Sequence, residues 1–247
     1  MNINEQTILI SGAAGSVGSF LVRELSKEAK KVIAVDRDAV KLSSLQSENN
    51  IEVHACDLTA PDEVVRVIGL ILNEHSVTIL INLAGLIHSE PLVNLLNKQN
   101  SRHSFTSWND TLKANLYSTF YLSSVVAESM VKKRLRGVII NTSSIAAQGN
   151  IGQTAYAAAK AGVEAMTKVW SKELGMFKIR CTCIAPGFFN TPSTHVGLNE
   201  AMVEKWKKLT PIGKLGELAE LSGAVRFIIA NDFYNGKVLQ LDGGLNI

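Results

Sequence analysis

Short apolar runs rich in β-branched residues recur along the chain, and they alternate with longer segments whose apolar residues recur at helical spacing. Such runs are typical of strands that are buried on both faces of a sheet. Their alternation with helices predicts an α/β fold with a doubly wound parallel sheet and right-handed crossovers. We expect about seven strands, in the segments 7–10, 31–36, 51–56, 77–85, 138–141, 179–184 and 237–241. Ligands of such sheets bind beyond the carboxyl ends of the strands.

The segments between these strands predict helices, of which the longest covers 108–134. The polar segment 193–211 is bracketed by prolines and predicts a helical lid, within a region of about 188–211 that covers the site. No composition shift, repeat or low-complexity segment marks a boundary. We therefore expect one domain over residues 1–247, which is an ordinary length for a single α/β domain.

The segment 86–107 is longer and more polar than a simple connection requires. We expect it to form a surface insertion near one rim of the site. Its two histidines, His88 and His103, are more typical of solvated or locally bonded side chains than of catalytic ones.

Composition narrows the class of protein. The net charge of +3 comes without a long basic run, so nucleic acid is not an expected partner. Three cysteines form no disulfide framework, and the pair Cys181 and Cys183 predicts buried free thiols rather than a metal site. The chain shows neither a signal-peptide pattern nor an apolar stretch that could span a bilayer, so we expect a cytoplasmic protein with no membrane partner.

A Gly-rich turn joins the first strand to the first helix. Its glycines, Gly12, Gly15 and Gly18, let the backbone turn tightly and approach a pyrophosphate, whose charge the following helix N-terminus stabilises. Ser16 and Val17 lie between the last two glycines. The strand before the turn and the helix after it favour a nucleotide-binding turn over a chance Gly pattern.

The second strand ends in Asp36, about 20 residues after the glycines. A carboxylate at that position accepts hydrogen bonds from the adenosine ribose hydroxyls and repels a 2′-phosphate. Arg37 follows directly and could pair with such a phosphate. The pattern thus favours NAD(H) over NADP(H) and leaves NADP(H) open.

Tyr156 and Lys160 stand four residues apart in an Ala-rich helical stretch, so their side chains share one face of the helix. A free tyrosine titrates near pH ~10, and a neighbouring cation lowers that value. The pair therefore predicts a general acid/base that works near neutral pH. On spacing alone, a packed tyrosine beside a solvated lysine is the more common arrangement.

Taken together, these motifs resemble the short-chain dehydrogenase/reductase family in its compact, Rossmann-fold form, over essentially the whole chain. The residues that carry the resemblance are the turn Ser11–Gly18, Asp57, the run Asn82-Leu83-Ala84-Gly85, Asn115, Ser143 and Ser144, Tyr156 and Lys160, Pro186-Gly187 with Thr191, and the closing Asp242-Gly243-Gly244. Each motif is unspecific by itself, whereas their order and distances together are specific.

The resemblance implies a role for each matched residue. Tyr156 would be the catalytic acid/base, Lys160 would lower its pKa and hold the nicotinamide ribose, and Asn115 would hold a water that links Lys160 to solvent. A serine would hydrogen-bond the substrate oxygen. The remaining matches would contact the cofactor: Asp57 and Leu58 at adenine, Asn82, Ala84 and Gly85 on the adenosine side, and Pro186, Gly187 and Thr191 at the nicotinamide carboxamide.

Three positions depart from the family pattern. Ser16 stands where the middle glycine of the turn is expected, and Ser11 replaces a threonine. Leu83 replaces the second asparagine of an Asn-Asn-Ala-Gly run. The catalytic serine has two candidates, because counting back from Tyr156 gives Ser143 whereas counting forward from the strand gives Ser144; we favour Ser144, since a strand fixes position better than a loop.

Within the family, the segments 149–153 and 211–216 resemble those of 3-oxoacyl-thioester reductases and 3-hydroxyacyl dehydrogenases. The resemblance implies an NAD(P)-dependent oxidoreductase that interconverts a ketone and a secondary alcohol, assembled as a homotetramer or homodimer. The alternatives are an epimerase or dehydrogenase on a sugar or other small hydroxy compound, suggested by Gly15, and a non-catalytic nicotinamide-binding protein. The intact Ser, Tyr, Lys and Asn set speaks against a protein that only binds.

Overall fold

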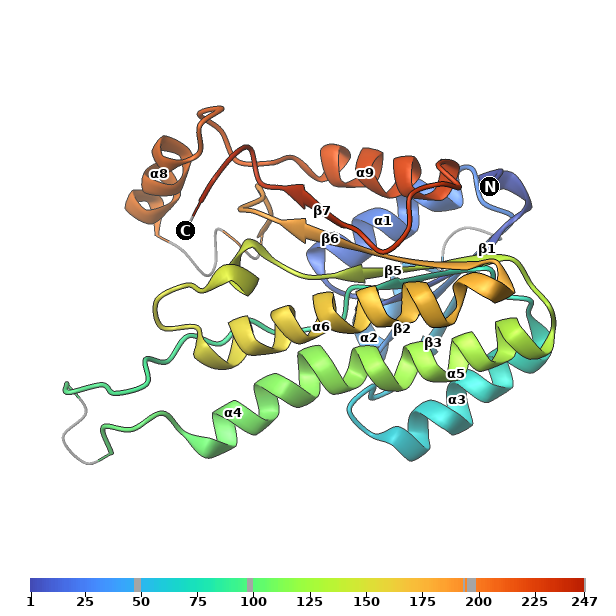
Figure 1. Cartoon of the computed structure of the whole chain (residues 1–247), viewed down its shortest axis with the longest axis horizontal. Helices are drawn as coiled ribbons and strands as arrows, with labels where there is room; N and C mark the ends of the chain where they lie inside the picture. The colour runs from blue at the N-terminus through green and yellow to red at the C-terminus, as the bar shows by residue number, and fades with distance from the viewer. Residues whose placement is uncertain (47–49, 97–99, 193, 195–198, 247) are drawn as a thin grey trace.

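The computed structural model describes residues 1–46, 50–96, 100–192, 194 and 199–246. Its centre is a parallel seven-stranded sheet in the order β3-β2-β1-β4-β5-β6-β7, and this confirms the predicted fold class (Figure 1). The strands are β1 (Thr7–Ser11), β2 (Lys31–Asp36), β3 (Ile51–Ala55), β4 (Ile79–Asn82), β5 (Gly137–Thr142), β6 (Ile179–Pro186) and β7 (Val238–Leu241).

Helices cover both faces of the sheet because alternate residues of each strand point to opposite sides. Ile8 and Ile10 of β1 join the apolar core under α1 and α9, whereas Leu9 between them joins the core under α3 and α5. In Figure 1, α1 and α9 lie on one face of the sheet and α3, α5 and α6 on the other. The α-helices of the described residues are α1 (Ser16–Ser26), α2 (Ala39–Ser43), α3 (Pro61–Glu74), α4 (Phe105–Leu112), α5 (Ser118–Lys132), α6 (Thr154–Glu173), α8 (Glu200–Leu209) and α9 (Leu218–Ala230).

Two helical predictions differ in detail from the structure. The helix expected over 108–134 begins earlier, at Phe105, and a π-helical turn over Lys113–Tyr117 divides it into α4 and α5. The helix expected in the 193–211 lid is α8, which lies beyond the carboxyl ends of β6 and β7 (Figure 1). Residues 193 and 195–198 of that lid lie outside the described residues.

The insertion over 86–107 is tied to the rim of the site through Glu90. Its backbone N–H donates to the Gly152 carbonyl at 2.6 Å, and its carboxylate accepts from the Ser104 N–H. The His88 ring contacts the same carboxylate at 3.2 Å, and Nδ1 of His103 lies 3.0 Å from the Glu90 carbonyl oxygen. Both histidines are therefore bonded locally, as the sequence predicts.

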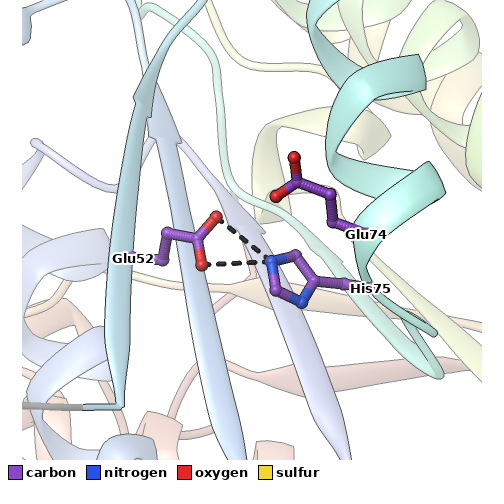
Figure 2. A group of neighbouring side chains, drawn as sticks. All are labelled: Glu52, Glu74 and His75. Carbon is purple, nitrogen blue, oxygen red and sulfur yellow. Dashed lines mark hydrogen bonds and ion pairs between the residues drawn. The ribbon is translucent and has the colours of Figure 1, made fainter.

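A second polar cluster joins the edge strand β3 to the end of α3 (Figure 2). The Glu52 carboxylate contacts the rings of His54 at 2.7 Å and His75 at 3.0 Å and pairs with Lys31 at 2.6 Å, and these partners hold its pKa at about 2 against the opposing effect of burial. Glu74 lies beside His75. The Lys31 ammonium compensates the charge of Glu52. The contact between Glu52 and His75 links the sheet to the helix layer that contains α3.

The three cysteines, Cys56, Cys181 and Cys183, are buried and free, which confirms the prediction made for the pair Cys181 and Cys183. Burial raises the pKa of Cys56 to about 11 and that of the other two thiols to about 12. These thiols are therefore protonated and unreactive at neutral pH. Within the described residues, each helix is too short or too polar to cross a membrane.

Candidate active site

A cleft of about 880 Å³ runs along the carboxyl edge of the sheet. The loops that follow β1, β2 and β3 line one half of it, and the loops that follow β4, β5 and β6 line the other half. All but one of the residues predicted to be catalytic or to bind the cofactor line this cleft: Gly12, Gly15, Ser16, Val17, Gly18, Asp36, Arg37, Asp57, Leu58, Ala84, Gly85, Asn115, Ser143, Ser144, Tyr156, Lys160, Pro186, Gly187 and Thr191.

The Gly-rich turn fits an anionic group held close to the backbone. Gly12 has φ +67°, and a Cβ there would lie 2.7 Å from the Ala84 nitrogen. A Cβ on Gly18 would lie 2.1 Å from the Gly12 carbonyl oxygen, so only glycine permits this approach of helix to turn. Gly15 is the N-cap of α1 and Ser16 its first residue, so the positive end of the helix dipole faces the cleft.

Asp36, Arg37 and Asp57 line the same half of the cleft. The two oxygens of Asp36 accept hydrogen bonds from the backbone N–H groups of Ala14 and Asp38, each at 3.0 Å. Hydrogen bonds from the Thr59 backbone and hydroxyl, with the charge of Arg37, lower the pKa of Asp57. Both carboxylates are therefore fixed in direction, and the Arg37 charge lies near an acid.

Asn82 is the exception, because it lies beneath the cleft and does not line it. Its side-chain amide donates to Ser123 Oγ at 2.9 Å and to Asn141 Oδ1 at 2.8 Å, and the residue is 3% exposed. The side chain thus forms a buried cross-link among β4, β5 and α5. The cofactor contact that the family resemblance implies for Asn82 stays a prediction, and it would have to come from the backbone.

The Ser11 hydroxyl supports the neighbouring loop from the end of β1. It accepts hydrogen bonds from the backbone N–H groups of Leu83 at 3.1 Å and Ala84 at 3.3 Å. Serine therefore supplies the hydroxyl that this position requires, even though the family pattern has threonine. The contact fixes the Ala84–Gly85 backbone against the Gly-rich turn.

Tyr156 and Ser144 meet at the centre of the cleft. Tyr156 lies in the first turn of α6 and is buried, and the Ser144 side chain is close enough to its hydroxyl to lower the pKa of the phenol against the larger effect of burial. Ser143 faces the opposite way, because its hydroxyl donates to Glu164 Oε1 at 2.7 Å. Of the two serine candidates, Ser144 is thus the one beside the phenol.

Lys160 is 4% exposed, and its ammonium donates to the Thr142 carbonyl oxygen at 2.9 Å. Burial lowers the Lys160 pKa to about 8. The ammonium nitrogen lies 5.6 Å from the centroid of the Tyr156 ring. At neutral pH the Lys160 side chain is therefore a cation close to the Tyr156 ring.

The direction of the Tyr156 pKa differs from the expectation. Burial raises it, and the hydrogen bond from Ser144 offsets only part of that effect. The Lys160 ammonium donates a hydrogen bond to the Thr142 carbonyl rather than to the phenol. Desolvation is therefore the largest influence on the pKa of Tyr156. The phenol is consequently a proton donor at neutral pH in this state of the protein.

The π-helical turn brings Asn115 into the site from the α4–α5 helix. Its amide donates to the Leu86 and Thr111 carbonyls, each at 2.9 Å. Its Oδ1 is buried and has no hydrogen-bond partner within the described part of the chain. A Cβ on Gly85 would lie 2.4 Å from this oxygen and 3.6 Å from Lys160 Nζ, so glycine leaves the space between them open. A buried, unpaired acceptor beside an ammonium fits a bound water.

The loop after β6 closes the other end of the cleft. The Gly187 N–H donates to the Leu241 carbonyl at 2.9 Å, and the buried Thr191 hydroxyl contacts the Thr194 hydroxyl at 2.9 Å. Phe188 stacks on Trp206 of α8, with ring centroids 4.2 Å apart. The lid helix is therefore attached to the cleft wall through an aromatic pair.

Some lining residues were not predicted individually as site residues. They fall in the loops after β4, β5 and β6, where apolar side chains face the cleft beside a polar rim: Leu86, Ile87, Ser89, Ile145, Ala146, Asn150, Gln153, Phe188 and Phe189. An apolar residue in a loop looks the same in sequence whether it faces a cleft or a neighbouring helix. Only their adjacency to the motifs Gly85, Ser144 and Gly187 could have pointed to them.

This geometry agrees with comparisons to known proteins. A family model described as Enoyl-(Acyl carrier protein) reductase matches residues 12–246. The chain belongs to the short-chain dehydrogenase/reductase family. Membership confirms the resemblance in the sequence and makes the protein an oxidoreductase of a family that uses a nicotinamide cofactor.

Individual relatives cover the full chain. The 3-oxoacyl-[acyl-carrier-protein] reductase of Thermotoga maritima is 32% identical over 100% of both chains. The (3R)-3-hydroxyacyl-CoA dehydrogenase of Canis lupus familiaris is 29% identical over 99% of this chain and 98% of its own. Among solved structures, a 3-hydroxyacyl-CoA dehydrogenase type-2 from Mycobacterium avium superposes with a TM-score of 0.87 at 28% identity, covering 100% of this chain and 98% of the other.

Proposed function

We propose that the protein is a nicotinamide-dependent reductase of 3-oxoacyl thioesters, or the corresponding 3-hydroxyacyl dehydrogenase in the reverse direction. The observation that carries this proposal is the convergence of Ser144, Tyr156 and Lys160 on one point of a cleft whose other half is a phosphate-binding turn. The names of the full-length relatives support the substrate class.

In the proposed reaction the bound cofactor supplies or accepts the hydride, and the protein orients the reactants and moves the proton. Tyr156 gives its proton to the carbonyl oxygen of the substrate during reduction. The Ser144 hydroxyl hydrogen-bonds the same oxygen and stabilises the charge that develops on it. The Lys160 ammonium stabilises the phenolate that remains, and a water on Asn115 Oδ1 returns a proton from solvent to that end of the site.

The rest of the cleft suits an acyl chain on a polar carrier group. Apolar side chains of the loops after β4, β5 and β6 line the same cleft as Ser144, namely Ile87, Ile145 and Phe188. Farther out, Gln153 connects Asn150 at 3.0 Å with Ser89 at 3.2 Å in a chain of side-chain hydrogen bonds. Apolar walls favour the acyl group, and the amide rim offers donors and acceptors to a thioester carrier.

For the cofactor we propose NAD(H) over NADP(H). Asp36 has both oxygens fixed by backbone N–H groups, so its charge stays at the ribose position and repels a 2′-phosphate. The charge of Arg37 lies near Asp57, which leaves it less available to that phosphate.

We also propose one domain and a cytoplasmic homotetramer or homodimer. Large apolar side chains stand exposed along the helices that carry Asn115 and Tyr156, including Phe105, Tyr117, Phe120 and Val169. A helix face of this kind is typical of a surface that a second subunit covers.

The experiment that tests this function titrates the protein with NADH and NADPH by fluorescence and then adds an acetoacetyl thioester. Tighter NADH binding followed by oxidation of NADH supports the proposal. The variant Tyr156→Phe should lose turnover and keep NADH affinity, whereas Tyr234→Phe, which lies outside the cleft, should behave as the wild type. Binding of NADH without oxidation would reject the thioester, and turnover by Tyr156→Phe would reject the mechanism.

A further inference from the structure

Helix α6 holds three consecutive residues, the last two of β5 and the one that follows it. Asn141 Nδ2 donates to Thr167 Oγ1 at 2.9 Å, and the Thr142 carbonyl accepts from the Lys160 ammonium at 2.9 Å. The Ser143 hydroxyl donates to Glu164 Oε1 at 2.7 Å, with a weaker approach to the Lys160 carbonyl at 3.3 Å. Each contact joins a residue just before Ser144 to the helix that carries Tyr156.

The contact between Ser143 and Glu164 bears most directly on Ser144. The two serines are consecutive, and Ser144 has an extended backbone with φ −165° and ψ 157°. Side chains of consecutive extended residues point to opposite sides. Holding the Ser143 hydroxyl against α6 therefore turns the Ser144 hydroxyl toward the cleft and the phenol.

Glu164 is suited to this role by its chemistry and its place on the helix. A carboxylate acceptor makes the hydrogen bond charge-assisted, and such bonds are stronger than neutral ones. Glu164 stands four residues after Lys160 and eight after Tyr156, so one rigid helix carries the phenol, the ammonium and the group that holds the serine segment. It does not itself line the cleft.

We propose that Glu164 is a positioning residue, which acts through Ser143 to direct the Ser144 hydroxyl at Tyr156 and the reacting oxygen. The role in turnover rests on the proposed function. The geometric part of the proposal does not, since the hydrogen bond between Ser143 and Glu164 is present without any substrate. A hydroxyl displaced by about 1 Å loses much of its transition-state stabilisation, whereas the cofactor half of the cleft is unaffected.

The kinetic test compares Glu164→Met, Ser143→Ala, the double variant and Glu164→Gln, with Glu173→Met on the exposed end of the same helix as the matched control. We expect kcat for the thioester to fall about tenfold in Glu164→Met and in Ser143→Ala, with the NADH dissociation constant unchanged. The double variant should be no worse than either single variant, because both remove the same contact. Glu164→Gln keeps an acceptor and should recover most of kcat.

A second measurement does not need the substrate. In protein labelled with ¹³C at tyrosine Cζ, the Tyr156 signal, assigned by its loss in Tyr156→Phe, reports the hydrogen bond at the phenol. The chemical shift of the Tyr156 signal should change in Glu164→Met and Ser143→Ala and should stay at the wild-type value in Glu164→Gln and Glu173→Met. A wild-type signal in Glu164→Met would overturn the proposal. Absence of turnover in the wild type, with the expected shifts present, would reject the proposed substrate and keep the positioning role.

Discussion

The Lys160 ammonium nitrogen lies 2.9 Å from the Thr142 carbonyl oxygen, at the end of the strand that leads to Ser144. The contact joins the cation of the site to the segment that carries its serine. It also means that a buried charge is stabilised by a backbone dipole and by no carboxylate within hydrogen-bonding distance in the described residues. The burial of this lysine has consequences for both stability and activity.

The first prediction concerns stability as a function of pH. Lowering the Lys160 pKa from 10.5 to about 8 corresponds to about 3 kcal/mol of unfavourable free energy. Below pH 8 both folded and unfolded chains hold the proton, so the penalty is complete. Between pH 8 and 10.5 the unfolded chain binds more protons, so stability rises with pH and the penalty disappears. Urea unfolding should therefore show the advantage of Lys160→Met over the wild type shrinking by about 3 kcal/mol across this range.

The matched control for that measurement is Lys168→Met, an exposed lysine on the same helix. Its stability relative to the wild type should not change between pH 8 and 10.5. An advantage of Lys160→Met that stays constant over this range would show that the ammonium is not buried in the folded protein.

The second prediction concerns the rate of reduction. Tyr156 keeps its proton at neutral pH because burial raises its pKa, and the Lys160 cation stabilises the phenolate formed when that proton leaves. Because kcat/KM reports the ionisations of the free enzyme, it should fall as pH rises through about 8, where Lys160 loses its charge. The check is a pH profile of thioester reduction at saturating NADH. A flat profile to pH 9.5 would contradict this account of the lysine.

The third prediction concerns the space between Asn115 and Lys160. Gly85→Ala places a methyl group 2.4 Å from Asn115 Oδ1, which must move or lose the water that it would hold. We expect kcat to fall at least about tenfold, as for a misplaced catalytic group. Gly69→Ala, whose added Cβ meets nothing within 4 Å, is the matched control and should keep full activity. Equal kcat in the two variants would mean that this space has no part in turnover.

The fourth prediction concerns cofactor preference. Asp36→Ala removes the acceptors proposed for the adenosine ribose and the charge that repels a 2′-phosphate. We expect the NADH dissociation constant to rise about tenfold, since hydrogen bonds to a charged group contribute about 1.5–3 kcal/mol, and the NADPH constant to stay level or fall. Fluorescence titrations measure both constants. Asp62→Ala, which removes one carboxylate outside the cleft, should leave their ratio unchanged, and an unchanged ratio in Asp36→Ala would reject the assignment of Asp36.

Particular residues show which features of the structure could be predicted from the sequence. The strand pattern and the Gly-rich turn predicted the sheet and the position of the cleft, because local period and glycine geometry depend on neighbouring residues. Asn82 shows the limit: the family resemblance implied a cofactor contact there, but no local pattern predicted that its side-chain amide binds Ser123 and Asn141 on other elements. The helical pattern did not predict the π-helical turn at Asn115 for a similar reason, since the Asn115 side-chain amide donates to the Leu86 carbonyl of a loop distant in sequence.

The sequence by itself determined the doubly wound sheet and the set of polar groups at its carboxyl edge, since strand period, glycine spacing and the four-residue step from Tyr156 to Lys160 are local properties. Only the tertiary structure decided which serine faces the phenol, because Ser143 is drawn to Glu164 on another element. The same holds for the pKa of Tyr156. Its direction depends on how much solvent the surrounding fold removes, and burial raises it against the smaller opposing effect of Ser144.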